Sequence, residues 1–462
     1  MRNKTVPDLQ HVRALGALAI GGLIVLALTG GSARADIPSL LLLRPAAALL
    51  IAASFLFPRA DLARDLSRPA LFVGLLAALI LVQLVPMPPS LWSSLPGREI
   101  YLDTARLAGI APLWMPLSIA PMRTLNSLLA LLPIAAALLL LTRLPARWLH
   151  FVPMIVVGLA CLSALLGIVQ LSGGEGSFAY LYRFVGESLP TGLFANRNHQ
   201  AVLLAASLPF AAVLFVDSPL FASRRAGFAL SLVLALIVFV LFATGSRSGM
   251  VALLIGGLAS ILILSRSALF KGRAAVLLIG GAGSVAILVG IAAAFGRLAA
   301  YQRFLGLGDL GGEMRYATFS ITTRLAWDYL PFGSGFGSFD TLFRMHEPDR
   351  LLKPTYFNAA HNDWLELVIT AGVPGALVAL LFLGWFGLRL ARLFAAPPNA
   401  FAQLARASAA FVVIALVASI SDYPLRTPLM GVIFLIACVV LEHCARAQKS
   451  SGRDGAGLLG KN

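Results

Sequence analysis

Long apolar segments recur along most of the chain, separated by short polar connections. Each segment approaches the roughly 20 residues that a helix needs to cross a bilayer, so the pattern predicts about 12 membrane spans. The predicted spans are Ala14–Gly30, Ile37–Phe57, Pro69–Val85, Thr124–Leu141, Phe151–Leu171, His199–Val216, Gly227–Thr244, Gly249–Leu264, Ala274–Phe295, Asp363–Leu388, Phe401–Ile420 and Leu425–Leu441. The expected fold is an all-α polytopic membrane protein.

The longest interruption of this pattern separates the ninth and tenth predicted spans. It is too rich in aromatic residues for a disordered linker, so we expect a small folded helical cap. These aromatic residues are Tyr316, Phe319, Trp327, Phe332, Phe336, Phe339 and Tyr356. The expected organisation is nine spans in residues 1–296, the cap in 297–361, three spans in 362–444 and a cytoplasmic tail in 445–462, which is Gly-rich, polar and expected to be disordered from Ser450 onward.

Composition supports a membrane protein. Of the 462 residues, 59% are hydrophobic and only 12% are charged, which excludes the ordinary soluble classes. The net charge of +16 follows in part from topology and in part suits an anionic lipid or phosphate partner; no nucleic acid partner is expected. The three cysteines show neither metal-ligand spacing nor a disulfide framework, so no metal site or cofactor is expected.

The basic residues alternate from loop to loop. Those at the N-terminus and in every second connection fall on one side, which the positive-inside rule makes cytoplasmic. They include Arg59, Arg64, Arg68, Arg143, Arg147, Arg224, Arg225, Arg266, Lys271, Arg273, Arg389, Arg392, Arg446, Lys449 and Arg453. Both termini are then cytoplasmic, and the long loops, including the cap, lie outside. ATP and nucleotide sugars are scarce there, so a substrate on that face must carry its own activation, as a lipid-linked pyrophosphate does.

Two of the outer connections carry an arginine beside a span. The segment TGLFANRNHQA places Arg197 and His199 at the mouth of the sixth span, as a binding site or as an interfacial cap with a snorkelling arginine. The segment ATGSRSGM places Arg247 beside Ser246 in a very short connection, against the positive-inside bias. A guanidinium beside hydroxyls and backbone N–H groups suits a pyrophosphate, although an arginine that reaches lipid headgroups is the alternative.

The cap contains a predicted helix, Met314–Leu330, which carries Arg315 and Arg324. Arg324 is four residues before Asp328, so a surface ion pair is one explanation for it. The glycine-rich PFGSGFGSF that follows has no lysine and no preceding strand, and a turn before a short helix explains it.

The cap ends at the sequence HNDWLELVITAGVPG. Asp363 and Glu366 have the spacing of a capping box at the start of the tenth span, which explains both as structural. His361 and Asn362 then lie just outside the helix, unexplained by capping. A lone histidine is usually structural, but at the membrane face it can act as a base toward a lipid-linked substrate.

In their order and spacing these motifs resemble the O-antigen ligase/polymerase superfamily of bacterial envelope proteins. The resemblance rests on SRSG at Ser246–Gly249, on Arg324-Leu-Ala-Trp327 followed by PFGSGFGSF, on HNDWLELVITAGVPG and on GLFANRNHQA. It covers residues 190–385 closely and the whole chain in its hydropathy layout.

The resemblance implies a metal-independent, inverting membrane glycosyltransferase with a GT-C-like architecture in the bacterial inner membrane. Such proteins take a glycan from undecaprenyl pyrophosphate on the periplasmic side and pass it to a hydroxyl of lipid A core, a growing glycan or a protein. Arg247 and Arg324 correspond to the family's pyrophosphate-binding arginines, with Arg315 as a competitor of Arg324, and His361 to its essential histidine, a general base. Further candidates for substrate binding are Arg197, His199, Asn362 and Ser246.

Other classes of protein remain open from the sequence. A protein oligosaccharyltransferase of the same superfamily shares the motifs. A flippase for lipid-linked glycans predicts charged residues near mid-membrane, where Arg44 is the main candidate. A peptidoglycan-type glycosyltransferase needs an outer catalytic carboxylate, for which Asp340 and Asp349 are available, and a non-enzymatic envelope scaffold is the remaining alternative.

Overall fold

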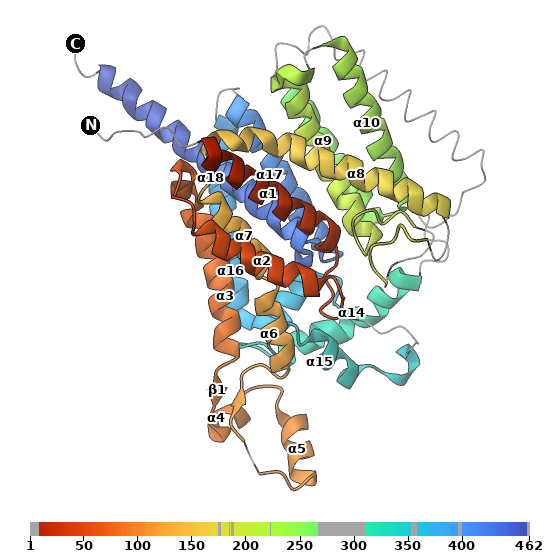
Figure 1. Ribbon diagram of the computed structural model, residues 1–462. Coiled ribbons are helices and arrows are strands. Elements are labelled where there is room, and N and C mark those ends of the chain that lie inside the picture. Colours follow the sequence, from red (N-terminus) through yellow and green to blue (C-terminus); the bar gives the residue numbers. More distant parts are fainter. Residues whose placement is uncertain are drawn as a thin grey trace.

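The computed structural model describes residues 9–459 except 112, 174–176, 184, 186–188, 222, 267–309, 353–357 and 396–399. It is a helical bundle (Figure 1). The first half contains α1 (Leu9–Thr29), α2 (Leu40–Ser54), α3 (Ser67–Gln83), α4 (Pro89–Ser93), α5 (Glu99–Leu107), α6 (Pro121–Leu129), α7 (Leu132–Leu141), α8 (Val152–Gly173) and α9 (Arg197–Asp217). The second half contains α10 (Arg224–Ala243), α11 (Arg247–Ser265), α14 (Leu310–Asp328), α15 (Phe339–His346), α16 (Asp363–Ala395), α17 (Ala400–Ala418) and α18 (Pro428–Leu459).

Short elements complete the description. The strands β1 (Pro86–Met87) and β2 (Met115–Pro116) form a two-stranded antiparallel ladder. The 3₁₀ helices are Asp61–Leu66, Ala146–Phe151, Pro219–Phe221, Asp349–Leu351 and Pro424–Arg426.

Within the described residues, 10 helical segments are long and apolar enough to cross a membrane. This confirms the all-α polytopic fold. The second predicted span corresponds to α2, which is shorter and contains Pro45. The ninth, 274–295, lies outside the described residues.

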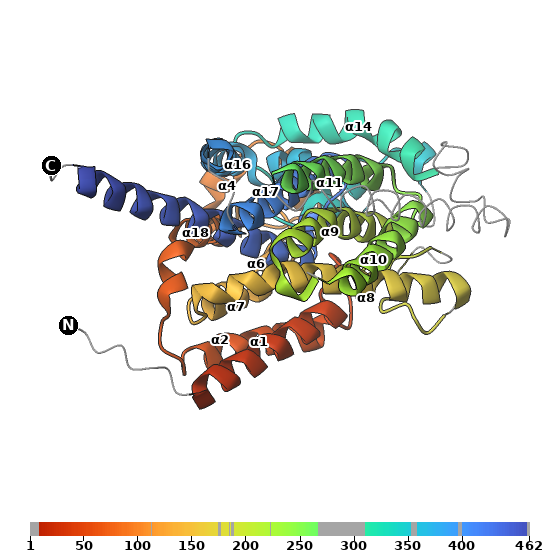
Figure 2. The ribbon, with the colours of Figure 1, turned by 90° about the horizontal axis from the view of Figure 1, so that it is seen from above.

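The core of the bundle is α9, which α8, α11 and α17 surround (Figure 2). Its side chains from Gln200 to Ser207 are almost wholly buried. Small residues permit this close packing, as they do in many membrane helix pairs. A Cβ at Gly256 of α11 would collide with the carbonyl oxygen of Ala205 in α9. The position of the α9 N-terminus is therefore well fixed by tertiary contacts.

Helix α16 is broken near its start. Gly372 has φ 57° and ψ −148°, outside the helical region, and Pro374 follows it. The glycine-rich cap segment fills the break: Ser334 N–H donates to Ile369 O at 2.9 Å, Gly335 N–H donates to Thr370 O at 2.9 Å, and Val373 N–H donates to Pro331 O at 2.8 Å. The break thus joins the cap to the span.

Gln83, at the end of α3, holds this junction from the other side. Its side-chain Nε2 donates to Thr370 O at 2.9 Å, and its Oε1 accepts from Phe336 N–H at 2.8 Å. As the sequence predicts, turns precede a short helix, α15, and a cap helix, α14, precedes Pro331. Because α14 also packs on α16, the cap is a folded extension of the bundle.

The tail differs from expectation. The tail from Ser450 was predicted to lack regular structure, but α18 continues from the membrane span to Leu459. The helix has a complete turn of helix-favouring residues, Ala445 to Lys449, directly after the apolar segment, so it propagates rather than ends there. The start of α1 and the end of α18 lie at the same end of the bundle (Figure 1).

Candidate functional site

The segments singled out in the sequence meet at one end of the bundle, opposite the start of α1. Three backbone hydrogen bonds join the loops at this end of the bundle. Ala195 N–H donates to Gly31 O at 3.1 Å, Leu429 N–H donates to Gly30 O at 2.9 Å, and Asp363 N–H donates to Ser419 O at 2.8 Å. The loop after α1 and the starts of α9, α16 and α18 therefore form one continuous surface.

The centre of this surface is a buried carboxylate, Asp422, which lies between α17 and α18. Its Oδ1 lies 3.5 Å from His361 Nδ1 and 3.7 Å from His199 Nε2, both at ion-pair distance. Its Oδ2 accepts hydrogen bonds from Asn198 Nδ2 at 2.6 Å and from Asn196 Nδ2 at 3.3 Å. One carboxylate thus joins two histidines that are separated by more than 150 residues in the sequence.

The contacts of Asp422 affect its pKa more strongly than its burial does. Desolvation would raise the pKa of the carboxyl, but the two imidazoles beside it hold the pKa of Asp422 well below its usual range. Asp422 is therefore an anion throughout the physiological pH range. The carboxylate is placed to orient the ring of either histidine and to stabilise that ring when it is protonated.

The two histidines differ in access. The side chain of His361 is 20% exposed, whereas those of His199 and Asp422 are each 2% exposed. The ring of Tyr423 packs against both histidines, with its centroid 5.1 Å from that of His361 and 5.2 Å from that of His199. A substrate at the surface can therefore reach His361, while His199 supports Asp422 from the interior.

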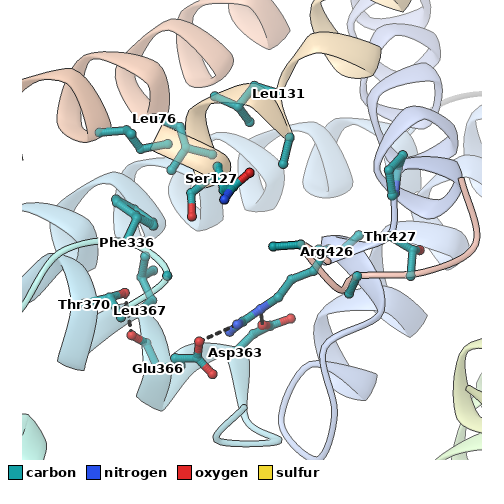
Figure 3. Close-up of a pocket in the computed structure, with 18 of the residues that line it drawn as sticks. Leu76, Ser127, Leu131, Phe336, Asp363, Glu366, Leu367, Thr370, Arg426 and Thr427 are labelled. Carbon is teal, nitrogen blue, oxygen red and sulfur yellow. Dashed lines mark hydrogen bonds and ion pairs between the residues drawn. The ribbon is translucent and has the colours of Figure 1, made fainter. Parts of the chain in front are cut away.

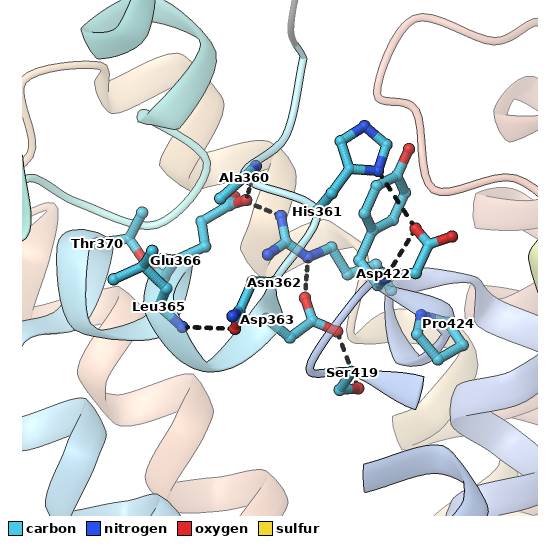
Figure 4. A network of polar contacts seen from close by, with 12 residues as sticks. Ala360, His361, Asn362, Asp363, Leu365, Glu366, Thr370, Ser419, Asp422 and Pro424 are labelled. Atoms are coloured by element: carbon cyan, nitrogen blue, oxygen red, sulfur yellow. Dashed lines mark hydrogen bonds and ion pairs between the residues drawn. The ribbon is translucent and has the colours of Figure 1, made fainter. Parts of the chain in front are cut away.

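The backbone at His361 is unusual. Its φ of 49° lies in the left-handed region, which few residues other than glycine adopt. Such conformations persist only where the surroundings enforce them, and they concentrate at functional sites. Here the turn directs the imidazole toward Asp422 immediately before α16 begins (Figure 4).

The capping interpretation of the next residues needs correction. The capping side chain is Asn362, whose Oδ1 accepts from Leu365 N–H at 3.0 Å. Asp363 and Glu366 both pair instead with Arg426: Asp363 Oδ1 lies 2.6 Å from Nε, and Glu366 Oε1 contacts Nη1. Sequence spacing suggested a capping box because Asp363 and Glu366 are three residues apart, but their partner comes from the connection between α17 and α18.

Arg426 is a structural clamp for this end of α16. The cost of burying its guanidinium lowers its pKa, but the two carboxylates outweigh that cost and raise the pKa above its ordinary value. Glu366 Oε2 also accepts from Ala360 N–H at 2.8 Å, which fixes the residue before His361. The clamp therefore helps to hold the turn that carries His361.

The two outer arginine motifs also meet. Arg197 Nη1 donates to Thr244 O at 3.2 Å, which joins the start of α9 to the connection before α11. Ser246 is buried and caps α11 by accepting from Gly249 N–H at 3.0 Å. Arg247 is the first residue of α11, and its side chain is exposed. An exposed guanidinium at a helix N-terminus suits an anion.

The cap arginines lie on α14, which packs against α16. The side chain of Arg324 is 84% exposed, and its Nε lies 3.9 Å from Asp328 Oδ2, as the spacing predicts. Arg315 is also in α14, but its side chain is outside the described part of the structure. Among the described residues, no group of three or more His, Cys, Asp or Glu side chains could hold a metal ion.

Asp422 and Arg426 were not singled out from the sequence. Both belong to the connection SDYPLRTP, and Arg426 fell at the start of the last predicted span, Leu425–Leu441. A usable signal was present: an aspartate and an arginine four residues apart interrupt two apolar segments at the outer end, where the positive-inside rule disfavours arginine.

Part of the chain is similar to a known protein family. A family model described as O-antigen ligase matches residues 230–380, which include Arg247, both cap arginines and His361. None of the curated proteins compared with the chain matches it. The family match supports a glycosyl-transfer function of the ligase or polymerase type. With the membrane helices and the motif order, the match over residues 230–380 supports a relation to the O-antigen ligase/polymerase superfamily.

Proposed function

We propose that the protein transfers a glycan from undecaprenyl pyrophosphate to an acceptor hydroxyl, with His361 as general base. The observation that carries the proposal is the contact between the accessible His361 and the buried Asp422. His361 lies inside the segment that matches the ligase family. Motif position alone suggested the histidine; the carboxylate behind it supplies a group that can orient the imidazole ring.

The geometry favours one tautomer of His361. Nδ1 faces Asp422, so in the neutral ring Nδ1 carries the hydrogen and Nε2 carries the lone pair. Nε2 takes the proton of the acceptor hydroxyl as the acceptor oxygen attacks the anomeric carbon. The bond from that carbon to the pyrophosphate oxygen breaks, and the configuration inverts. Asp422 stabilises the imidazolium that forms.

The leaving group is a lipid pyrophosphate, whose added negative charge needs a counter-charge. Arg247, at the N-terminus of α11, has both a guanidinium and adjacent backbone N–H groups to offer. Arg324 or Arg315 on α14 supplies a second cation from the cap. Two planar guanidinium groups can neutralise a pyrophosphate without a metal ion.

The site lies on the periplasmic face of the inner membrane in this proposal, with both termini cytoplasmic. The positive-inside pattern supports that orientation. The start of α1 and the end of α18 lie at the same end of the bundle (Figure 1), whereas His361 contacts Asp422, just before the opposite end of α18. The acceptor is lipid A core, a growing glycan or a protein hydroxyl.

A purified-enzyme assay of His361→Gln tests the base assignment. Transfer should fall by about 10²-fold or more, because glutamine cannot take the proton, and donor binding should stay within a few-fold of wild type. His346→Gln is the matched control, since His346 is an exposed histidine of α15 in the same cap. Near-normal turnover of His361→Gln would show that His361 only fixes the turn.

A further inference from the structure

A cavity of about 540 Å³ lies beside the His361 site, between α2, α3, α6, α16 and the start of α18 (Figure 3). Its volume is within the range of small-molecule sites, about 300–1,000 Å³. The polar lining residues belong to the outer ends of these helices and include Arg34, Arg44, Arg123, Asn126, Ser127 and Arg426. The apolar ones follow deeper along the same helices and include Leu76, Leu79, Pro133, Val378, Ala379 and Phe382. The cavity is therefore amphipathic along the expected membrane normal.

Arg44 is the lining residue whose hydrogen-bonding capacity and charge are least satisfied by the protein. It lies in α2 between Leu43 and Pro45, within an otherwise apolar helix. Its Nη2 donates to Asn126 Oδ1 at 2.9 Å, but its Nε is buried without a hydrogen-bond partner. Among the described residues, no carboxylate oxygen lies within 4 Å of its nitrogens. A cation in that position is costly unless an anion accompanies it.

The other arginines that line the cavity have carboxylate partners. Asp36 pairs with Arg34 at 2.6 Å, Asp340 pairs with Arg123 at 3.2 Å, and Asp363 and Glu366 share Arg426. Among the described lining residues, Arg44 is the arginine without a carboxylate within 4 Å. A phosphate in the cavity would supply the missing negative charge and could accept hydrogen bonds from several guanidinium groups.

We propose that this cavity binds a phosphate-bearing membrane lipid. The phosphate lies at Arg44, between Asn126 and Arg123, and the chains run along Leu79 and Ala379 toward the bilayer interior. The Arg426 clamp with Asp363 and Glu366 forms the wall on the side of Asp422, so the lipid lies beside His361 and not on it. The binding does not depend on the transfer reaction.

Lipid binding to the full-length protein, measured by native mass spectrometry, tests this proposal. The probe is phosphatidylglycerol, and phosphatidylcholine with the same chains is the neutral comparison. Wild type should prefer phosphatidylglycerol, and Arg44→Gln should weaken its binding about 10-fold, as expected for loss of a charged hydrogen-bond donor. The matched control is Arg106→Gln on α5, an exposed arginine paired with Asp103 outside the cavity. It should leave the affinity unchanged.

Equal binding of the two lipids by wild type, or unchanged affinity in Arg44→Gln, would overturn the proposal. Ala379→Phe provides a second variant, because it fills the apolar part of the cavity without altering charge. It should also weaken phosphatidylglycerol binding, and it decides the question if Arg44→Gln does not fold. Competition identifies the source of the lipid: displacement by undecaprenyl pyrophosphate points to a lipid-linked substrate, and its absence points to a phospholipid of the bilayer.

Discussion

Asp422→Asn is the substitution that separates a positioning carboxylate from a structural one. Asparagine retains the size of the side chain but removes its charge and replaces one acceptor oxygen with a donor. In wild type both oxygens accept: Oδ1 from Tyr423 N–H at 3.0 Å and Oδ2 from Asn198 Nδ2 at 2.6 Å. In either orientation, the new amide group faces a donor.

The expected loss of activity in Asp422→Asn follows from the distance between Asp422 Oδ1 and His361 Nδ1. Two unit charges 3.5 Å apart attract by about 4.7 kcal/mol at an effective dielectric constant of roughly 20. Only the imidazolium of the transition state experiences this attraction in full. A loss of about 3 kcal/mol there corresponds to a fall in kcat of about 10²-fold, whereas KM for the donor should change little.

The assay is transfer by purified protein in vesicles, with kcat and KM measured across pH. The pKa of Asp422 is well below its usual range, so the carboxylate itself does not titrate near neutral pH. A change in the pH profile of Asp422→Asn would therefore arise from the groups beside the carboxylate. Asp103→Asn, an exposed aspartate of α5, is the control. Turnover within about threefold of wild type, with an unchanged pH profile, would refute the assigned role of Asp422.

Three further predictions concern the leaving group, the fold and the orientation. Arg247→Lys should lose transfer almost as severely as Arg247→Ala, because lysine lacks the planar fork, and full activity with lysine would exclude bidentate pyrophosphate binding. Gly372→Ala should lower thermal stability, because the backbone there has a positive φ and a Cβ would meet the Pro331 carbonyl. Gly384→Ala in the same helix is the control, since a Cβ there meets nothing within 4 Å. Equal melting temperatures of the two variants would contradict this reasoning. In a background without native cysteines, a cysteine at Glu347 should react with a membrane-impermeant reagent in spheroplasts and one at Arg225 should not; the reverse pattern would invert the topology.

Hydropathy was sufficient to predict the membrane helices because burial in lipid demands long apolar segments whatever their tertiary contacts. The boundaries of α3, α9 and α11 follow the predicted spans closely, whereas α1 begins five residues earlier than predicted. The break at Gly372 was missed, although Gly372 and Pro374 are visible in the sequence. Either residue can be accommodated in a membrane helix, and the break depends on the cap segment that fills it.

The candidate site was predicted only in part, because its parts come from distant segments. His361 and His199 stood out as polar residues beside apolar spans, but nothing in either motif indicates that both contact Asp422. Arg44 was noticed as a charge inside a span, and its meaning depends on the cavity that α3, α6 and α16 form around it. Tertiary packing, rather than local pattern, decides these contacts.

The central claim, glycosyl transfer from a lipid pyrophosphate by His361, is tested most directly by product analysis with purified protein in vesicles. Supplied with an undecaprenyl-pyrophosphate-linked glycan and an acceptor, wild type should form the glycosidic product and undecaprenyl pyrophosphate in equal amounts, with EDTA present. His361→Gln should form neither above background. Movement of intact lipid-linked glycan across the membrane without a new glycosidic bond, or equal product from His361→Gln, would contradict the claim.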